Sequence, residues 1–398
     1  MTYLQDPVVA RLASGSHISG EIPEFNHLPP GTADERARWV FIDMSQVGDP
    51  AVEEWFPVPD VQPMLDDAPA PRPVARDGDR CPITTPAYDE LQGYVGPAPA
   101  GIDAPFAWAR GVRGAGVQFA DVEGGWNAKH EDLPGARMTH VGGRNMTEPG
   151  WAAHGTAVLG EVVGIPNGKG VTGIAPDTDH VFTSSISGQS VADAIDTAAE
   201  ELRAGDVLLI ELQGAGPRGR YLPVEYWDDN YAAIRAATDR GVVVIEAAGN
   251  GGEDLDRGAY KGKLSRGVRD SGAIMVGAGG PPRPGFTDRT RLDFSNYGSR
   301  VDVQGWGRRV ATLDYGDLQS CDDDRSSRWR HYTGEFSGTS SASPIIAGAA
   351  ILLESAHGRA LTPRDVRRIL AETGTPQTGN DREHIGPRPD LARALDAK

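Results

Sequence analysis

The sequence lacks the features that mark membrane and nucleic-acid-binding proteins. No long apolar run interrupts its 398 residues, so a membrane-spanning helix is not expected. Basic residues are also scarce, with 39 Lys and Arg against 56 Asp and Glu and a net charge of −17. Nucleic acid and anionic lipid would repel such a chain. Because 39% of its residues are hydrophobic, the sequence predicts a soluble globular protein with a substantial core and neither partner.

Cysteine is nearly absent as well. Cys81 and Cys321 are the only two, and they are either two free thiols or one disulfide. Neither has a histidine or a second cysteine at metal-ligand spacing, so a zinc site is not expected. Residues 1–7 show no basic region followed by an apolar core, which favours a cytoplasmic protein or export by a route that the sequence does not reveal.

The chain divides at about residue 95. In the first part, residues 38–44 are typical of a strand and 51–56 of a strand or a short helix. Residues 57–73 are rich in proline and acid, which predicts an exposed linker. We interpret residues 1–95 as an N-terminal extension whose role the sequence leaves open, as it does the oligomeric state.

From residue 96 to 398 the pattern is that of one α/β domain. Continuous apolar segments such as 207–210 alternate with helical patterns such as 191–204 and 230–240. This alternation predicts a mostly parallel sheet covered by helices on both faces. Functional groups are then expected at the carboxyl ends of the strands.

The segment around Ser340 is the strongest functional signal. Residues 338–343 are small, and Pro344 opens an apolar run, which predicts a helix that begins at about Ser340. The free N–H groups and the positive dipole end of such a helix suit a developing oxyanion. A capping serine is the alternative interpretation of this motif taken alone.

Two further motifs favour the catalytic interpretation. The strand pattern at 117–121 ends in Asp121, and His154 opens another small-residue helix. A serine hydroxyl needs a base to take its proton, and the imidazole of that base needs a carboxylate to fix its tautomer. Asp121, His154 and Ser340, in this order along the chain, supply the carboxylate, the imidazole and the hydroxyl.

These motifs resemble those of the subtilases, the subtilisin-like serine peptidases, and the resemblance covers about residue 94 to the end. It implies a subtilisin-like three-layer fold and a serine endopeptidase that works through an acyl-enzyme. Residue by residue, it implies that Asp121 is the orienting acid, His154 the general base and Ser340 the nucleophile. Asn250, which follows the strand pattern 242–248, is implied as the oxyanion donor. The resemblance also allows the extension to be a propeptide.

Two binding sites are expected from the same resemblance. Asp132, in the motif 130–133, and Asn167, in the loop 167–170, would help to bind a structural calcium. Lys169 departs from a calcium loop, and an unmetallated loop is the alternative. No cofactor is expected for the chemistry.

The segment 211–216 corresponds to the edge that pairs with an extended peptide, with Gln213 and Gly214 as lining residues. Glu211 replaces a small residue there, and would either favour basic substrate side chains or be a surface or buried ion-paired glutamate. Glu123 is a second departure, and close to the triad it would hold His154 protonated to higher pH.

A peptide or protein is therefore the expected substrate. Two alternatives share these residues. One is a specialised processing protease, or a peptide ligase, with a single partner substrate. The other is a pseudoenzyme that only binds peptides.

Overall fold

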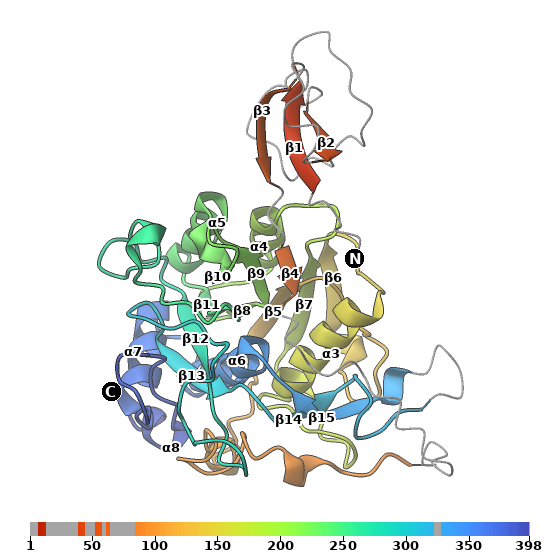
Figure 1. The fold of residues 1–398 in the computed structure, drawn as a ribbon. Coiled ribbons are helices and arrows are strands. Elements are labelled where there is room, and N and C mark those ends of the chain that lie inside the picture. Colours follow the sequence, from red (N-terminus) through yellow and green to blue (C-terminus); the bar gives the residue numbers. More distant parts are fainter. Residues whose placement is uncertain are drawn as a thin grey trace.

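A seven-stranded sheet, parallel at every pairing, forms the centre of the molecule (Figure 1). It is seen in a computed structural model that describes residues 7–12, 39–43, 52–57, 61–63, 84–321 and 328–397. The strand order is β13-β12-β11-β8-β5-β7-β6. In chain order these strands are β5 (Gln118–Glu123), β6 (Met138–Gly142), β7 (His180–Ser185), β8 (Val207–Ile210), β11 (Val243–Ala247), β12 (Ile274–Gly279) and β13 (Val303–Trp306).

Helices cover both faces of this sheet. Phe119 and Leu209 pack with α3 (Pro149–Val163) and α6 (Thr339–Ala356) in one apolar cluster. Ala120, Val122 and Leu208 pack with α4 (Val191–Glu200) and α5 (Asp228–Asp239) in another. Neighbouring residues of a strand thus face opposite helical layers, as the alternation of side chains requires. The predicted three-layer architecture is confirmed.

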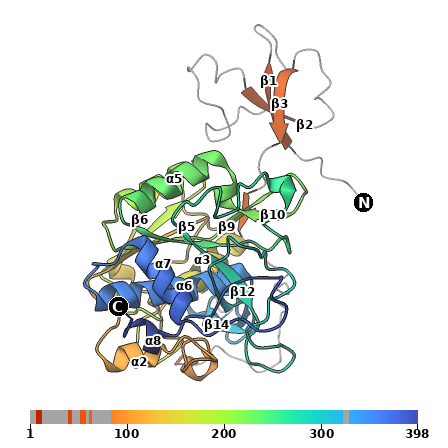
Figure 2. The ribbon, with the colours of Figure 1, turned by 90° about the vertical axis from the view of Figure 1, so that its left-hand side faces the viewer.

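Smaller elements complete the catalytic part of the chain. Figure 2 shows α7 (Pro363–Thr373) beside α6, and the Thr362 side chain caps α7. The hairpin of β14 (Val310–Leu313) and β15 (Tyr332–Phe336) leads directly into α6. The remaining elements are α2 (Ala104–Ala109), α8 (Leu391–Ala394), β9 (Leu212–Ala215), β10 (Tyr221–Pro223) and the 3-10 turns η3 (Asp89–Leu91), η4 (Gly135–Arg137), η5 (Val224–Tyr226), η6 (Gly258–Tyr260) and η7 (Arg328–Arg330).

The N-terminal extension contributes strands to two sheets. β1 (Pro7–Leu12), β2 (Trp39–Asp43) and β3 (Val52–Pro57) form an antiparallel sheet of their own, which confirms the strand predicted at 38–44. β4 (Val61–Pro63) instead pairs antiparallel with β9 of the catalytic part. The expectation of an exposed linker over 57–73 is therefore wrong at 61–63. Proline suggested a linker, but it is tolerated at the end of an edge strand.

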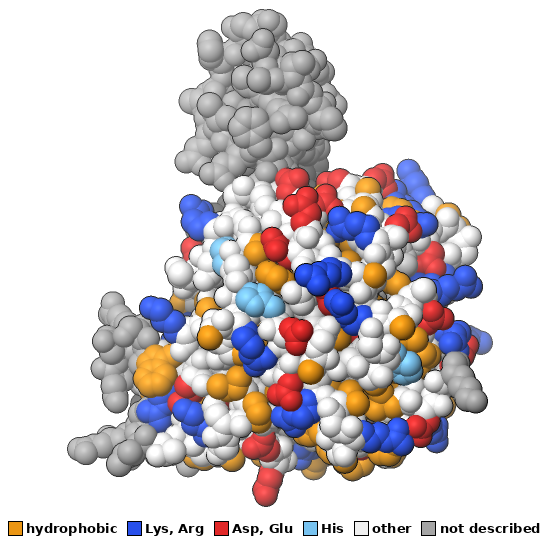
Figure 3. Space-filling view, turned by 180° about the vertical axis from the view of Figure 1, so that it is seen from behind, with side chains coloured by type: hydrophobic (Ala, Val, Ile, Leu, Met, Phe, Trp, Pro, Cys, Tyr) orange, Lys and Arg blue, Asp and Glu red, His pale blue; other side chains and the backbone are white. Residues whose placement is uncertain are grey.

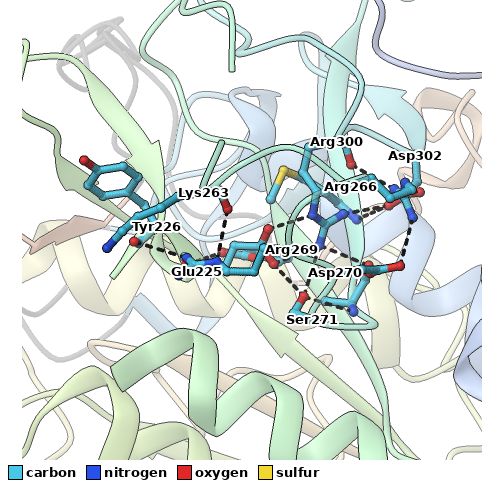
Figure 4. Close-up of polar contacts among 12 residues, drawn as sticks. Glu225, Tyr226, Lys263, Arg266, Arg269, Asp270, Ser271, Arg300 and Asp302 are labelled. Carbon is cyan, nitrogen blue, oxygen red and sulfur yellow. Dashed lines mark hydrogen bonds and ion pairs between the residues drawn. The ribbon is translucent and has the colours of Figure 1, made fainter. Parts of the chain in front are cut away.

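A buried ion pair joins Glu225 in η5 to Arg300, which precedes β13 (Figure 4). Arg300 is fully buried, and its Nε and Nη2 donate to Oε1 and Oε2 of Glu225 at 2.6 and 2.8 Å. Nη1 of Arg300 also lies 3.0 Å from Oδ2 of Asp302. Such a two-pronged contact fixes geometry as well as charge. It ties η5, the turn that follows β10, to the segment that precedes β13.

Other expectations have simpler outcomes. Cys321 is disulfide-bonded, and Cys81, the only other cysteine of the chain, lies outside the described residues. Within the described ranges, no helix is both long and apolar enough to cross a membrane. Acidic and basic side chains are interspersed on the face seen in Figure 3.

Candidate active site

Ser340 and Asn250 both lie beside Gly338. Ser340 is the second residue of α6, and Asn250 follows β11 by three residues. A Cβ atom on Gly338 would lie 3.2 Å from both Oγ of Ser340 and Nδ2 of Asn250. Gly338 has a φ of 103°, which L side chains rarely adopt. A side chain at this position would be crowded by both groups, so glycine lets the Ser340 hydroxyl and the Asn250 amide lie close together.

The amide of Asn250 is held in one orientation. Its Oδ1 accepts hydrogen bonds from the backbone N and from Oγ1 of Thr339, both at 2.9 Å. Its backbone N donates to Oε1 of Gln213 at 2.8 Å. Because two donors occupy Oδ1, Nδ2 is turned toward Gly338 and the side of Ser340.

His154 approaches the same region from α3. Its side chain is only 1% exposed, and its ring packs edge-on against Phe336 with centroids 5.4 Å apart. Phe336 ends β15, the strand that leads into α6, and α3 also packs directly on α6. The fold therefore brings His154 and Ser340 into neighbouring helices over the same face of the sheet.

The carboxylate at His154 is Glu123 and not Asp121. Oε1 of Glu123 contacts Nδ1 of His154 at short range. Asp121 instead accepts a 2.7 Å hydrogen bond at Oδ2 from Nε1 of Trp126, and its Oδ1 has no hydrogen-bond partner among the described residues. The expected pairing of Asp121 with His154 is wrong.

Strand geometry explains the error. Asp121 and Glu123 are two residues apart on β5 and so point to the same face of the sheet. The sequence pattern suggested that the strand ends at Asp121, whereas β5 continues to Glu123. The available signal was the Gly124–Gly125 pair, because the residue just before it stands at the carboxyl end of the strand.

Buried carboxyl groups surround this contact. Burial raises the pKa of Glu123 well above its usual value, and burial together with Glu123 does the same for Asp121. Glu161 in α3 and Glu211 after β8 are fully buried too, and burial raises both of their pKa values. No Lys or Arg forms an ion pair with any of the four within the part of the chain that the structure describes. His154, the basic group here, contacts Glu123 and acts electrostatically on Asp121.

Gln213 and Gly214 lie on an edge built for strand pairing. They belong to β9, which has β10 on one side and β4 on the other. Val61, Gln62 and Pro63 stand opposite Gly214, Gln213 and Leu212. An extended segment of the same chain therefore occupies the edge predicted to bind peptides.

Glu211 does not line this edge. Its side chain is fully buried, and its Oε1 lies 2.6 Å from Oγ of Ser343, in the first turns of α6. It forms no ion pair within the described ranges. The expectation of contact with basic substrate side chains is therefore wrong, and so is that of an ion-paired glutamate.

Asp132 and Asn167 come together, but as a hydrogen-bonded pair. Nδ2 of Asn167 donates to Oδ1 of Asp132 at 2.8 Å, and the backbone N of Val171 donates to Oδ2 at 2.9 Å. Nζ of Lys169 lies 2.6 Å from Oε2 of Glu131. Calcium needs six to eight oxygen ligands, whereas this loop presents N–H groups and an ammonium. The described residues hold no cluster of three or more His, Cys, Asp or Glu suited to a metal. These residues do not fit the expected calcium.

Comparison with known proteins identifies the family. The family described as Peptidase S8, the Subtilase family, matches residues 125–386, which is more than half of the chain. The chain belongs to the subtilase family. Its predicted class, a subtilisin-like serine peptidase and so a hydrolase, is confirmed at this level. The match starts after Glu123, so both candidate acids lie outside it.

Individual relatives of this subtilase are distant. It is 30% identical to Subtilisin Savinase of Lederbergia lenta over 64% of its own length and 81% of the relative's. It is also 30% identical to an alkaline protease of Alkalihalobacillus alcalophilus, of which it spans 58%.

Solved structures show the same fold. A protease from Pseudoalteromonas arctica has a TM-score of 0.59 at 23% identity, over 79% of this chain and 98% of that one. Fervidolysin from Fervidobacterium pennivorans is a keratinolytic enzyme related to subtilisin. Its structure has a TM-score of 0.60 at 18% identity, and the match covers 100% of this chain and 61% of fervidolysin. At these identities the likeness concerns the fold alone, and it agrees with the predicted subtilisin-like architecture.

Proposed function

We propose that this subtilase is an endopeptidase in which Ser340 is the nucleophile, His154 the general base and Glu123 the orienting acid. The observation that carries the proposal is that Oγ of Ser340 and Nδ2 of Asn250 both lie 3.2 Å from the Cβ position of Gly338, and so lie close to each other. A nucleophile and an oxyanion donor must stand on the two sides of one reacting carbonyl.

The reaction follows from these positions. Oγ of Ser340 attacks the peptide carbonyl carbon while its proton passes to Nε2 of His154. Glu123 accepts the Nδ1–H hydrogen bond and stabilises the imidazolium. His154 then gives the proton to the leaving amine, which leaves an acyl-enzyme on Ser340. A water molecule, deprotonated by His154, hydrolyses that ester and restores the serine.

The oxyanion is stabilised at the start of α6. Nδ2 of Asn250 is one donor, and the backbone N of Ser340 lies 3.4 Å from the same point at Gly338. That N–H is one of the first in a helix, which have no intrahelical acceptor. Removal of one such donor typically lowers kcat by about 10²–10³-fold.

The substrate is an extended peptide or protein segment on β9. The pairing of β4 with Gln213 and Gly214 supports this, because it shows that the edge accepts a strand through main-chain hydrogen bonds. The same pairing gives the extension a role. Residues 61–63 cover the edge, and a substrate has to displace them.

The test is labelling of Ser340 with a fluorophosphonate, beside Ser340→Ala, with mass spectrometry of a peptide library. The proposal expects labelling of the wild type only, with several cleavage sites in the library. Absence of labelling, with and without β4, would instead support a peptide-binding pseudoenzyme. Labelling together with cleavage of a single partner protein would support the processing protease. Transfer of the acyl group to an added amine would support the ligase.

A further inference from the structure

Glu211 holds a place next to the site that the reaction above does not use. It follows β8, and its backbone N donates to the carbonyl of Val122 in β5 at 3.1 Å. Its side chain lies on the face of the sheet that α6 covers, fully buried against Ser343. A carboxyl group at this depth needs a specific hydrogen-bond partner.

The contacts of Ser343 show how that need is met. Oγ of Ser343 lies 2.6 Å from Oε1 of Glu211 and 2.7 Å from the carbonyl oxygen of Thr339. A serine hydroxyl has one proton to donate. The hydroxyl proton can point at only one of these two oxygens, and the carbonyl has no proton to give. With the Ser343 proton on Thr339, the contact to Glu211 is satisfied when the carboxyl group of Glu211 is protonated and donates to Ser343.

Ser341 offers a comparison on the same helix turn. Its Oγ also has two acceptors, the carbonyl oxygens of Trp306 and Gly338, but at 3.0 and 3.1 Å. One shared proton accounts for two long contacts. Both contacts of Ser343 are shorter by 0.4 Å, and one of its two neighbours can carry a proton of its own.

The surroundings of Glu211 favour its neutral form. Burial is the largest cause that raises the pKa of Glu211 well above its usual range, and it outweighs the hydrogen bond with Ser343, which lowers that pKa. Its acidic neighbours, Asp121 and Glu123 from β5 and Glu161 from α3, raise the pKa further. No ion pair to Glu211 exists among the described residues, and its Oε2 has no hydrogen-bond partner there. The base of the site, His154, is already in contact with Glu123.

From Ser343 the contacts lead to the oxyanion donor. Ser343 donates to the carbonyl of Thr339, whose backbone N and Oγ1 both hold Oδ1 of Asn250. We propose that Glu211, as a neutral carboxylic acid, is a positioning residue that holds Asn250 in place through Ser343 and Thr339. This inference rests on the proposed peptidase activity.

The proposal has a defined pH signature. Below its pKa, Glu211 donates to Ser343, and the Ser343 proton remains on Thr339. As pH rises through that pKa, the carboxylate becomes an acceptor and draws the Ser343 proton away from Thr339. Activity is then lost at the alkaline side, separately from the acidic loss caused by protonation of His154.

The experiment compares Glu211→Gln and Glu211→Ala with wild type in pH profiles of kcat and KM. The Gln amide donates at every pH, so we expect kcat within about threefold of wild type and no alkaline fall. Glu211→Ala removes the contact, so we expect kcat to fall about tenfold to a hundredfold with KM nearly unchanged. Equal losses in the two variants, or an unchanged alkaline fall in Glu211→Gln, would overturn the proposal.

Two controls make the result specific. Glu161→Gln replaces a buried carboxyl group that has no hydrogen-bond partner among the described residues. It should retain the alkaline fall but shift it to lower pH, because Glu161 no longer raises the pKa of Glu211. Ser343→Ala should match Glu211→Ala, and the double variant should lose no more than either single one. Additive losses would contradict a shared path.

A readout without activity separates the two proposals. If wild type neither cleaves peptides nor is labelled at Ser340, the peptidase proposal fails. The protonation of Glu211 is still read from thermal unfolding, because a raised folded pKa gives stability that is lost as pH rises. The Tm of wild type should then fall with rising pH more steeply than that of Glu211→Gln, and parallel curves would contradict the neutral carboxyl.

Discussion

Glu123 lies with its carboxylate against Nδ1 of His154, and both side chains are buried. Glu123 is the last residue of β5, and His154 lies in α3, which packs on that strand. A glutamate therefore occupies the place where an aspartate was expected from the sequence.

The first prediction concerns this acid. Glu123→Gln keeps the shape but cannot stabilise the imidazolium, so we expect kcat to fall by about 10⁴-fold. Asp121→Asn still accepts the hydrogen bond from Trp126, and its kcat should stay within about threefold of wild type. Steady-state kinetics on a peptide substrate measures both. The reverse order of losses would return the role to Asp121.

The second prediction concerns the oxyanion donor. Asn250→Ala removes Nδ2 and should lower kcat by about 10²–10³-fold while KM changes little. Thr339→Val removes one of the two donors to Oδ1 of Asn250 and keeps the backbone N. We expect it to cost about tenfold, because the amide is loosened and not lost. A larger loss in Thr339→Val than in Asn250→Ala would contradict this assignment.

The third prediction concerns β4. Removal of residues 1–63 uncovers the edge of β9 and should lower KM for an extended peptide, with kcat nearly unchanged. Removal of residues 1–57 leaves β4 paired with Gln213 and Gly214, so it serves as the matched control. Initial rates over a range of peptide concentrations distinguish the two. Identical KM values would show that residues 61–63 do not compete with substrate.

The fourth prediction concerns the loop at Asp132. Because Lys169 pairs with Glu131 there, we expect neither EDTA nor added calcium to change Tm. Lys169→Met should lower the free energy of unfolding by about 0.5–1 kcal/mol. Lys129→Met, at an exposed position nearby, is the control and should be neutral. A rise in Tm on addition of calcium to wild type would contradict the assignment.

The sequence predicts those features of the fold that depend on local patterns. Continuous apolar runs indicate parallel strands such as β8, and proline beside a capping threonine marks the start of α7 at Thr362. The beginning of α6 was predicted within one residue for the same reason.

Features that depend on which side chain reaches a partner were not predictable in this way. Asp121 and Glu123 share a face of β5, so the pattern alone could not show which one meets His154. In the loop that was expected to bind calcium, the residue types are those of a calcium site, but Asn167 points its Nδ2 and not its oxygen at Asp132. Composition likewise could not show that Val61–Pro63 pairs with β9, because the partner lies about 150 residues away in the chain.

The pairing of β4 with β9 is an intramolecular one, and this has a kinetic consequence. A segment of the same chain competes at an effective concentration that is commonly about millimolar. A free peptide at micromolar concentration would rarely displace it, however well its side chains fit. A single cut between residue 63 and β9 would remove the covalent link, so that β4 could dissociate and be diluted into the solvent. One proteolytic cleavage would therefore be enough to open the edge of β9 to substrate.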